Sequence, residues 1–323
     1  MPYTLLVTAP TLAPAGRALL DAGHHRVLYM PQGQGPADIE RLLAQEPVDA
    51  IISRTLDLTP AAIAAARHLK VISKHGVGVS NIAVEAATAR GIPVYVTPGA
   101  NAQSVAEMAL GLLLAASRRI SWMDGEIRAG RWSRAQDGLE LNGRTLGLVG
   151  FGQVARRLWR ACQSLGMQAV VYDPFLPAAA DLQGARRVAT LAELLPLSQV
   201  LSLHIPLTPQ TRGLIGSAEL AALPADALLI NTARGEVIDE PALVAALSAG
   251  RLFGAGLDTT AEEPLSPDSP LLVLDNVVLT PHVGGSTPAA LAAMATGAVR
   301  NVLGFLDGHP PVVEACVNPA VLS

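Results

Sequence analysis

The first hundred residues alternate short apolar runs with segments of helical spacing. Three of those segments predict helices, and the last of the three has Thr59 as its N-cap and Pro60 at its first position. The helices are expected at Pro14–Ala22, Ala37–Ala44 and Pro60–Ala66, and the strands at Thr4–Thr8, Arg26–Tyr29, Ala50–Ile52, Val71–Ser73 and Val94–Val96. Strands that alternate with helices in this way predict a parallel sheet covered on both faces.

A second alternating series follows the segment Ser104–Ser117, which is apolar on most faces and predicts a helix buried between two domains. The series ends in a helix that is capped by Thr287 and runs to about Leu306. We expect this last helix to pack back on the first domain. The other helices are predicted at Gln153–Leu165, Leu191–Leu195 and Pro241–Ala249, and the strands at Leu146–Val149, Gln168–Tyr172, Val200–Leu203, Ala227–Asn231, Gly254–Leu257 and Val277–Leu279.

Composition narrows the class of protein. A length of 323 residues suggests two domains, with cores built from small and aliphatic residues, because aromatics make up only 3%. The net charge of −4 and the lack of a basic tract argue against nucleic acid as a partner. Two cysteines are too few for a disulfide framework or a thiolate metal site, and no metal-ligand cluster is evident. Met1–Pro10 lacks the pattern of a secretory signal and Ala109–Ala116 is too short to span a bilayer, so we expect a cytoplasmic protein without a membrane partner.

A glycine-rich turn joins the strand Leu146–Val149 to the helix after it. Gly150 and Gly152 permit a tight turn, and the small Ala155 allows the helix and the strand to pack closely. In this pattern, amides at a helix N-terminus bind a pyrophosphate, and we expect cofactor contacts from Gly150, Phe151, Gly152, Gln153 and Val154. Asp173 follows the next strand, 21 residues after Gly152, and can accept hydrogen bonds from ribose hydroxyls. The pattern therefore predicts NAD rather than NADP.

Four ordered motifs resemble those of the D-isomer-specific 2-hydroxyacid dehydrogenases: Gly147–Ala155, Asn231–Gly235, Asp258–Pro264 and Pro281–Thr287. Within that family the chain is most similar to the hydroxypyruvate/glyoxylate reductase and short phosphoglycerate dehydrogenase branch. The resemblance implies an α/β fold of two doubly wound parallel-sheet domains, in which a Rossmann NAD domain (101–285) is inserted into a flavodoxin-like substrate domain (1–100 plus 286–323). It also implies a homodimer, formed largely through the nucleotide-domain face and the helix after Asn101. A C-terminal regulatory domain is not expected, because the chain stops at Ser323.

Reduction of a 2-keto acid by NADH requires a cation for the carboxylate and an acid for the developing alkoxide. Arg234 fits the first role, since it follows a predicted strand and its guanidinium can hold a carboxylate and the keto oxygen. His282 fits the second role, with a carboxylate from Glu263 raising the pKa of the imidazole toward the working pH. The resemblance assigns the same roles to these residues. Glu262 is the adjacent competitor for the carboxylate.

The resemblance also implies further contacts with the cofactor and the substrate. On the cofactor side we expect backbone contacts from Thr232 and Ala233, a carboxamide contact from Asp258 and close approach at Gly284 and Gly285. His204 with Pro206 would cover the cofactor, Thr211 would approach its pyrophosphate, and Arg234 and His282 would also contact it. On the substrate side, amides of Val77 and Gly78 would bind the carboxylate, and Asn101 and Ser104 would position the substrate or cap their helix. Arg54 would meet the distal end of the substrate or be an ordinary surface arginine. Ser80 stands where many relatives have Asp.

The sequence thus predicts an NAD-dependent D-2-hydroxyacid dehydrogenase that acts on a small 2-keto or 2-hydroxy acid. Hydroxypyruvate, glyoxylate and a phosphorylated or sulfonated analogue all remain open as substrates, as does the physiological direction. The alternative is a non-catalytic NAD(H)-sensing regulatory protein, because transcriptional co-repressors share this fold and its catalytic residues. The chain lacks the long extensions expected of a partner-recruiting protein, which favours the enzyme.

Overall fold

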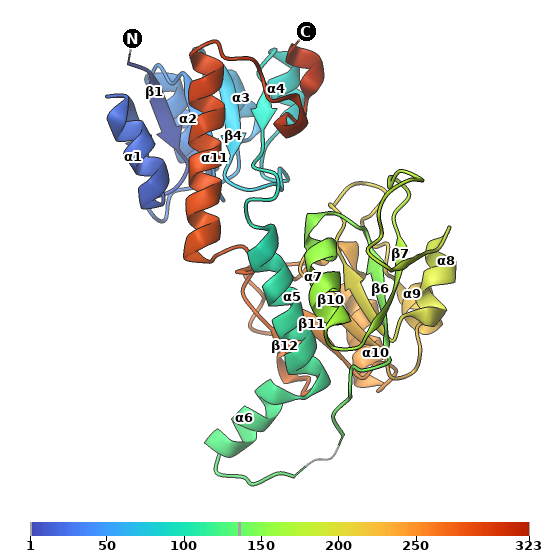
Figure 1. Cartoon of the computed structure of the whole chain (residues 1–323). Helices are drawn as coiled ribbons and strands as arrows, with labels where there is room; N and C mark the ends of the chain where they lie inside the picture. Colours follow the sequence, from blue (N-terminus) through green and yellow to red (C-terminus); the bar gives the residue numbers. More distant parts are fainter. Residues whose placement is uncertain (1, 135–136, 323) are drawn as a thin grey trace. The chain divides into compact units, whose positions relative to one another are not determined.

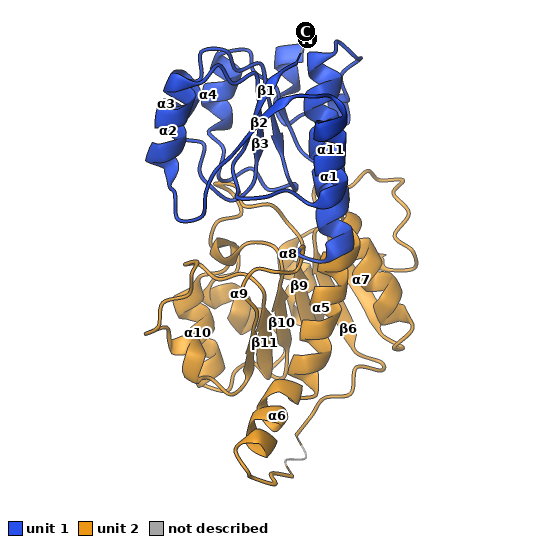
Figure 2. Ribbon diagram, turned by 90° about the vertical axis from the view of Figure 1, so that its left-hand side faces the viewer, with its two compact units in different colours: residues 1–101, 286–323 blue, residues 102–285 orange. Residues whose placement is uncertain are grey.

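The computed structural model describes residues 2–134 and 137–322. The chain forms two compact units: residues 1–101 with 286–323 make unit 1, and residues 102–285 make unit 2 (Figure 2). Each unit contains one parallel sheet with helices on its two faces, which confirms the predicted α/β fold class. The chain passes from unit 1 to unit 2 after Asn101 and returns after Gly285.

Unit 1 is built on a sheet with the strand order β2-β1-β3-β4-β5. The strands are β1 (Thr4–Val7), β2 (Arg26–Tyr29), β3 (Ala50–Ser53), β4 (Val71–Lys74) and β5 (Val94–Tyr95). The central strands are apolar and almost wholly buried, as expected of parallel strands covered on both faces. One face is covered by α2 (Pro36–Gln45), α3 (Pro60–Ala65) and α4 (Val84–Ala89), and the other by α1 (Pro14–Ala22) and α11 (Pro288–Leu306).

The helix α11 brings the C-terminal part of the chain into the core of unit 1. Thr287 caps it by accepting a hydrogen bond from the Ala290 amide at 3.2 Å, as predicted. At 19 residues, α11 is long and apolar enough to span a membrane. Four of its buried residues, Ala295, Ala298, Val299 and Val302, belong to the core that covers β1, β3 and β4. One side of α11 is therefore packed inside unit 1.

Unit 2 is built on a seven-stranded sheet with the order β12-β11-β10-β9-β6-β7-β8. The strands are β6 (Thr145–Val149), β7 (Gln168–Tyr172), β8 (Arg186–Arg187), β9 (Val200–Leu203), β10 (Leu228–Asn231), β11 (Gly254–Leu257) and β12 (Val277–Leu279). One face packs on α5 (Ala102–Ser117) and α7 (Gln153–Gln163), and the other on α8 (Leu191–Leu194), α9 (Ser217–Ala222) and α10 (Glu240–Ser248). The strand order reverses at β6, where open α/β sheets bind ligands at the carboxyl ends of their strands.

Apart from the 3₁₀ helices, four short elements were not predicted from the sequence: α4, α6 (Ile120–Arg128), α9 and the strand β8. None of the residues of α6 is buried, and its few apolar residues alternate with polar and charged ones, so its sequence is only a weak signal of a helix. In both ribbon views α6 extends away from the sheet of unit 2 (Figures 1 and 2). The strand β8 has only two residues, both arginines, and it exists because its backbone pairs with β7.

Candidate active site

The turn between β6 and α7 is packed at one glycine and open at the other. Gly150 has a φ of +86°, and a Cβ there would lie 2.6 Å from the carbonyl oxygen of His204. Gly152 is the N-cap of α7, and a Cβ there would meet no atom within 4 Å. Gln153 and Val154 begin the helix, so their amides lie at its N-terminus. The turn therefore offers backbone donors and open space on the same side, as an anion-binding helix start requires.

Asp173 ties the end of β7 to this turn. One carboxylate oxygen, Oδ2, accepts a hydrogen bond from the amide of Phe151 at 2.9 Å, and Oδ1 accepts one from the amide of Phe175 at 3.0 Å. The side chain is half-buried. Because a carboxylate has about four acceptor sites, Asp173 retains capacity for two hydroxyl donors.

The loop after β9 holds three of the predicted cofactor residues. His204 is anchored by its amide on the carbonyl of Val149 at 2.8 Å, and its Nε2 lies 2.9 Å from the hydroxyl of Ser202. Burial lowers the pKa of His204 to about 4, so the ring is neutral at physiological pH. The Thr211 hydroxyl donates to the carbonyl of Pro206 at 2.7 Å, which engages it within its own loop.

The loop after β10 is shaped by Asn231, for which the sequence predicted no separate role. The buried Asn231 accepts a hydrogen bond from the amide of Ala233 at 3.0 Å and donates one to the carbonyl of Arg234 at 2.9 Å. In the same loop, the hydroxyl of Thr232 is buried without a hydrogen-bond partner among the residues that the structure describes. Such a group fits a site that a ligand completes. The half-buried guanidinium of Arg234 donates to the Ala233 carbonyl at 2.6 Å through one of its five N–H groups.

Glu263 and His282 meet at the carboxyl ends of β11 and β12. The Oε2 atom of Glu263 lies 2.7 Å from Nδ1 of His282, and Oε1 accepts a hydrogen bond from the Thr260 amide at 3.3 Å. Glu262 instead offers its backbone carbonyl, to the hydroxyl of Thr260. Because an ionised carboxylate only accepts, Nδ1 carries the proton of the pair and Nε2 faces away from Glu263. The two side chains are 40% and 44% exposed, respectively, so a substrate can reach this ring.

Asp258 organises the backbone on both sides of His282. Its carboxylate is 2% exposed and accepts hydrogen bonds from the Thr280 hydroxyl at 2.6 Å and from the amides of Val283 and Gly284 at 3.0 and 2.8 Å. Its carbonyl accepts the amide of His282 at 2.8 Å, and His282 adopts a left-handed φ of +54°. The contacts made by Asp258 fix the loop that presents His282.

The loops of Arg234 and Glu263 are in direct backbone contact. A Cβ at Gly235 would lie 1.9 Å from the carbonyl carbon of Thr260, so only glycine fits there. Unit 2 therefore brings the glycine turn, Arg234, Glu263 and His282 to the carboxyl edge of a single sheet.

In unit 1, basic side chains gather at the ends of β3 and β4. Arg54 has a half-buried guanidinium that donates to the carbonyl of Thr11 at 3.3 Å, and burial lowers the pKa of Arg54. No carboxylate among the described residues lies within ion-pair distance of it. Lys74 donates to Oδ1 of Asn81 at 2.5 Å and to the carbonyl of Arg54. Neither Lys74 nor Asn81 had a role predicted from the sequence.

The loop after β4 presents Val77 and Gly78. It is fixed by Gly76, whose φ is +131° and whose amide donates to the hydroxyl of Thr97 at 3.1 Å. His75 is 8% exposed, and burial, followed by the charge of Arg54, lowers the pKa of His75 to about 4. Val77 is 47% exposed, as a residue that contacts a ligand through its backbone can be.

Two predicted substrate residues flank the passage from unit 1 to unit 2. Asn101 is the last residue of unit 1 and is half-buried, and Ser104 is buried in the first turn of α5 in unit 2.

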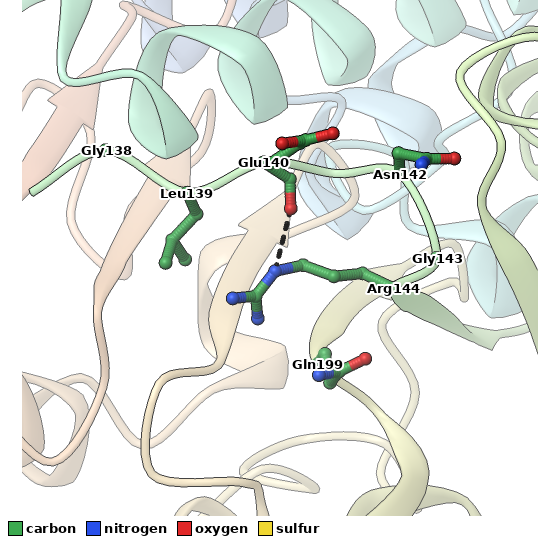
Figure 3. Close-up of a pocket in the computed structure, with 7 residues that line it drawn as sticks. All are labelled: Gly138, Leu139, Glu140, Asn142, Gly143, Arg144 and Gln199. Atoms are coloured by element: carbon green, nitrogen blue, oxygen red, sulfur yellow. Dashed lines mark hydrogen bonds between the residues drawn. The ribbon is translucent and has the colours of Figure 1, made fainter.

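Unit 2 also has a shallow depression of about 530 Å³, which none of the candidate site residues lines (Figure 3). Its lining includes Glu140, whose carbonyl accepts a hydrogen bond from Nε of Arg144 at 2.9 Å, and Gln199. These residues precede β6 and β9, so the depression lies at the amino ends of the strands and not at the candidate site. Across the described chain, no group of three or more His, Cys, Asp or Glu side chains could hold a metal ion.

Comparison with known proteins shows to which family the chain is similar. Residues 110–284 match the family described as D-isomer specific 2-hydroxyacid dehydrogenase, NAD binding domain. The chain is 38% identical over 269 residues to a glyoxylate reductase of Korarchaeum cryptofilum, with 81% of each chain covered. It is 39% identical over 317 residues to the D-3-phosphoglycerate dehydrogenase of Methanocaldococcus jannaschii, with 97% of this chain and 59% of the relative covered.

The fold is also shared with solved structures. One is an NADPH-dependent glyoxylate/hydroxypyruvate reductase of Sinorhizobium meliloti in complex with NADP and malonate. The two structures superpose with a TM-score of 0.85 at 28% sequence identity. The match covers 99% of this chain and 98% of the reductase chain. The chain matches only about half to three-fifths of the length of the phosphoglycerate dehydrogenases that it resembles.

Proposed function

Because this chain belongs to the D-isomer-specific 2-hydroxyacid dehydrogenase family, we propose that it transfers a hydride between NAD(H) and a small 2-keto or 2-hydroxy acid. The observation that carries the proposal is the 2.7 Å pair of Glu263 and His282. This pair lies at the sheet edge that also bears the glycine turn and Arg234. Because nucleotide-sensing co-repressors of this fold share these residues, turnover is the measurement that separates the two functions.

Unit 2 carries the NAD-binding domain of the family, so the cofactor is a nicotinamide dinucleotide. The residues fit this group: Gly152 faces open space, the Thr232 hydroxyl has no partner among the described residues, and Asp173 has spare acceptor capacity. We propose that the amides of the turn bind the pyrophosphate and that Asp173 binds the adenosine ribose. When bound, the nicotinamide supplies or accepts the hydride.

We assign proton transfer and binding of the substrate carboxylate to the chain's own residues. Nδ1 of His282 is held by Glu263, so we assign the proton that reaches the substrate oxygen to Nε2. The guanidinium of Arg234 can bind the carboxylate and the keto oxygen through its fork of N–H groups. In reduction, His282 gives up the proton as the keto oxygen gains negative charge, and in oxidation the neutral ring takes it back.

For the substrate, we propose an acid with a polar or anionic distal group. Arg54 supports this, because it is a half-buried cation without a carboxylate partner among the described residues. An uncompensated half-buried cation is costly to retain unless it meets an anion. Hydroxypyruvate and its phosphorylated or sulfonated analogues provide such a group, whereas glyoxylate has none.

We also propose a homodimer in the cytoplasm. Its support is the arm of unit 2, which we define as α6 together with residues 129–134. Ile120 and Ile127, seven residues apart on one side of α6, are about half exposed, and Trp132 is 81% exposed. Large apolar side chains that extend from a unit in this way are typical of a surface that a partner covers.

The test is NADH oxidation with a panel of 2-keto acids: glyoxylate, hydroxypyruvate and phosphohydroxypyruvate. We expect turnover with at least one acid, and loss of turnover with retained NADH binding in His282→Ala. NADH binding without turnover across the panel would favour the sensing protein instead. Absence of NADH binding would overturn both functions.

A further inference from the structure

We propose that Arg156, in the second turn of α7, is a positioning residue for cofactor binding. The inference rests on the proposed function, since it concerns the same dinucleotide site. Arg156 holds the glycine turn and the loop that follows Asp173 in one fixed arrangement.

The first contact of Arg156 is with Phe151, the residue between the two glycines of the turn. Its Nε donates to the Phe151 carbonyl at 3.1 Å, and its guanidinium carbon lies 4.5 Å from the centroid of the Phe151 ring. On the other side, the Phe151 amide donates to Asp173 at 2.9 Å. The peptide groups on both sides of Phe151 are therefore held by charged side chains, and the ring itself is buried at 1% exposure.

The second contact of Arg156 reaches the loop between β7 and β8. Its Nη1 donates to the carbonyl of Asp181 at 2.6 Å. From the same face of α7, Trp159 and Gln163 donate to the carbonyl of Gln183 at 2.9 and 2.7 Å. The loop begins at Asp173 and is mostly exposed. Its residues Leu176, Leu182 and Ala185 pack against the core of unit 2, and these hydrogen bonds add to that packing in holding the loop against α7.

A single guanidinium thus connects the segment that would bind the pyrophosphate to the segment that would bind the adenosine ribose. Only a side chain with donors in two directions can reach both carbonyls, and a lysine has a single charged nitrogen. Without this connection the amides of the turn and the Asp173 carboxylate would have to be ordered when the cofactor binds, which weakens affinity. The chemistry at His282 would be unaffected.

The experiment compares Arg156→Met and Arg156→Lys with the matched control Arg160→Met. Arg160 lies one turn further along α7 and is exposed, and its side chain makes no hydrogen bond or ion pair with the described residues. In Arg156→Met we expect the Kd for NADH and the inhibition constant of ADP-ribose to rise about tenfold, the usual cost of a lost charged hydrogen bond. The kcat at saturating NADH and the KM of the keto acid should stay unchanged. Arg156→Lys should not restore affinity, and Arg160→Met should match the wild type.

Three outcomes would overturn the inference. The first is an unchanged Kd for NADH in Arg156→Met while the wild type binds normally. The second is a greater loss of affinity for NADPH than for NADH, which would make Arg156 a ligand of a 2′-phosphate. The third is a loss of kcat equal to the loss of affinity. Failure of the wild type to bind NADH would instead overturn the proposed function.

If Arg156→Met does not fold, Trp159→Phe tests the same arrangement. It removes only the indole donor to Gln183 and keeps the packing of the ring. We expect a smaller rise in the Kd for NADH, in the same direction and with kcat unchanged. An unchanged Kd in this variant would overturn the inference.

Discussion

At the scale of single residues, the candidate site depends on how His282 is held. Asp258 fixes the backbone before and after it through Thr280, Val283 and Gly284, and Glu263 fixes the ring through Nδ1. The left-handed φ of +54° turns His282 away from the path of a continuing strand. The position of one imidazole therefore depends on two carboxylates with different tasks: Asp258 is buried and positions the loop, and Glu263 is accessible and faces the ring.

Replacing Glu263 with Gln should slow catalysis without weakening NADH binding. The Glu263 carboxylate lies 2.7 Å from Nδ1 of His282 and holds the ring in place. In Glu263→Gln this contact loses its charge, so the kcat of reduction should fall, while NADH binding stays near normal. His282→Ala should lower kcat by roughly 10²–10⁴, and the double variant should be little worse than His282→Ala alone. An unchanged kcat in Glu263→Gln, beside an inactive His282→Ala, would rule out Glu263 as the partner.

Asp173 should set the choice of cofactor. A 2′-phosphate would bring like charge against a carboxylate that already binds Phe151 and Phe175, so NADH should be preferred over NADPH by roughly two orders of magnitude in kcat/KM. Asp173→Asn keeps an oxygen acceptor for the Phe151 amide but removes the charge. Asp173→Asn should reduce the preference for NADH over NADPH, chiefly by raising the kcat/KM for NADPH. Equal efficiency of the wild type with both cofactors would contradict this role.

At the scale of elements, the strands and the long helices follow from the sequence because each buries a continuous apolar face. The ranges predicted for β2, β7, β9, β11 and β12 and for α1 are those observed, and Thr59 and Thr287 cap their helices as predicted. Helix α6 could not be predicted, because it buries nothing. Within the site, spacing cannot distinguish Glu262 from Glu263, since adjacent residues differ only in how the loop turns. Asn231, Lys74 and Asn81 were missed because their roles depend on contacts across loops.

The strand ends of unit 1 predict a test of substrate choice. Arg54→Ala should raise the KM for phosphohydroxypyruvate at least tenfold, because a charged hydrogen bond to the distal group is lost. Glyoxylate has no distal group, so its KM should change little. Arg67→Ala, an exposed arginine in the same unit, serves as the control. Equal changes in the KM of both substrates in Arg54→Ala would indicate that Arg54 is an ordinary surface residue.

At the scale of the whole molecule, unit 1 depends on both ends of the chain. Its core joins Leu5, Val7 and Ile52 to Ala295 and Val299 of α11. After α11, the chain also closes the edge of β5, where the amide of Val317 donates to the carbonyl of Val94 at 2.8 Å. Unit 1 is therefore completed only after the whole of unit 2 has been synthesised, which makes its contacts long in sequence.

Buried histidine should make the stability of unit 1 sensitive to acid. His75 has a pKa of about 4 in the folded chain, below its ordinary value of 6.5. Between these values the unfolded chain binds a proton that the folded chain does not, so stability is retained above pH 6.5 and falls as the pH drops toward 4. The loss is at most about 3 kcal/mol. Urea unfolding at several pH values should show a shallower decline for His75→Gln and an unchanged one for the exposed His309→Gln. An equally steep decline in His75→Gln would contradict the assignment.

The arm of unit 2 predicts the state of assembly. If the exposed faces of Ile120, Ile127 and Trp132 are covered by a second copy, placing charge among them should break the dimer, because a buried carboxylate without a partner is strongly unfavourable. Ile127→Glu should therefore sediment as a monomer at micromolar concentration, and Trp132→Ala should weaken the dimer. The matched control is Val273→Glu, which places the same charge at a valine that is 80% exposed elsewhere on unit 2. The control should stay dimeric. A wild type that sediments as a monomer, or an Ile127→Glu variant that stays dimeric, would show that the arm does not form the interface.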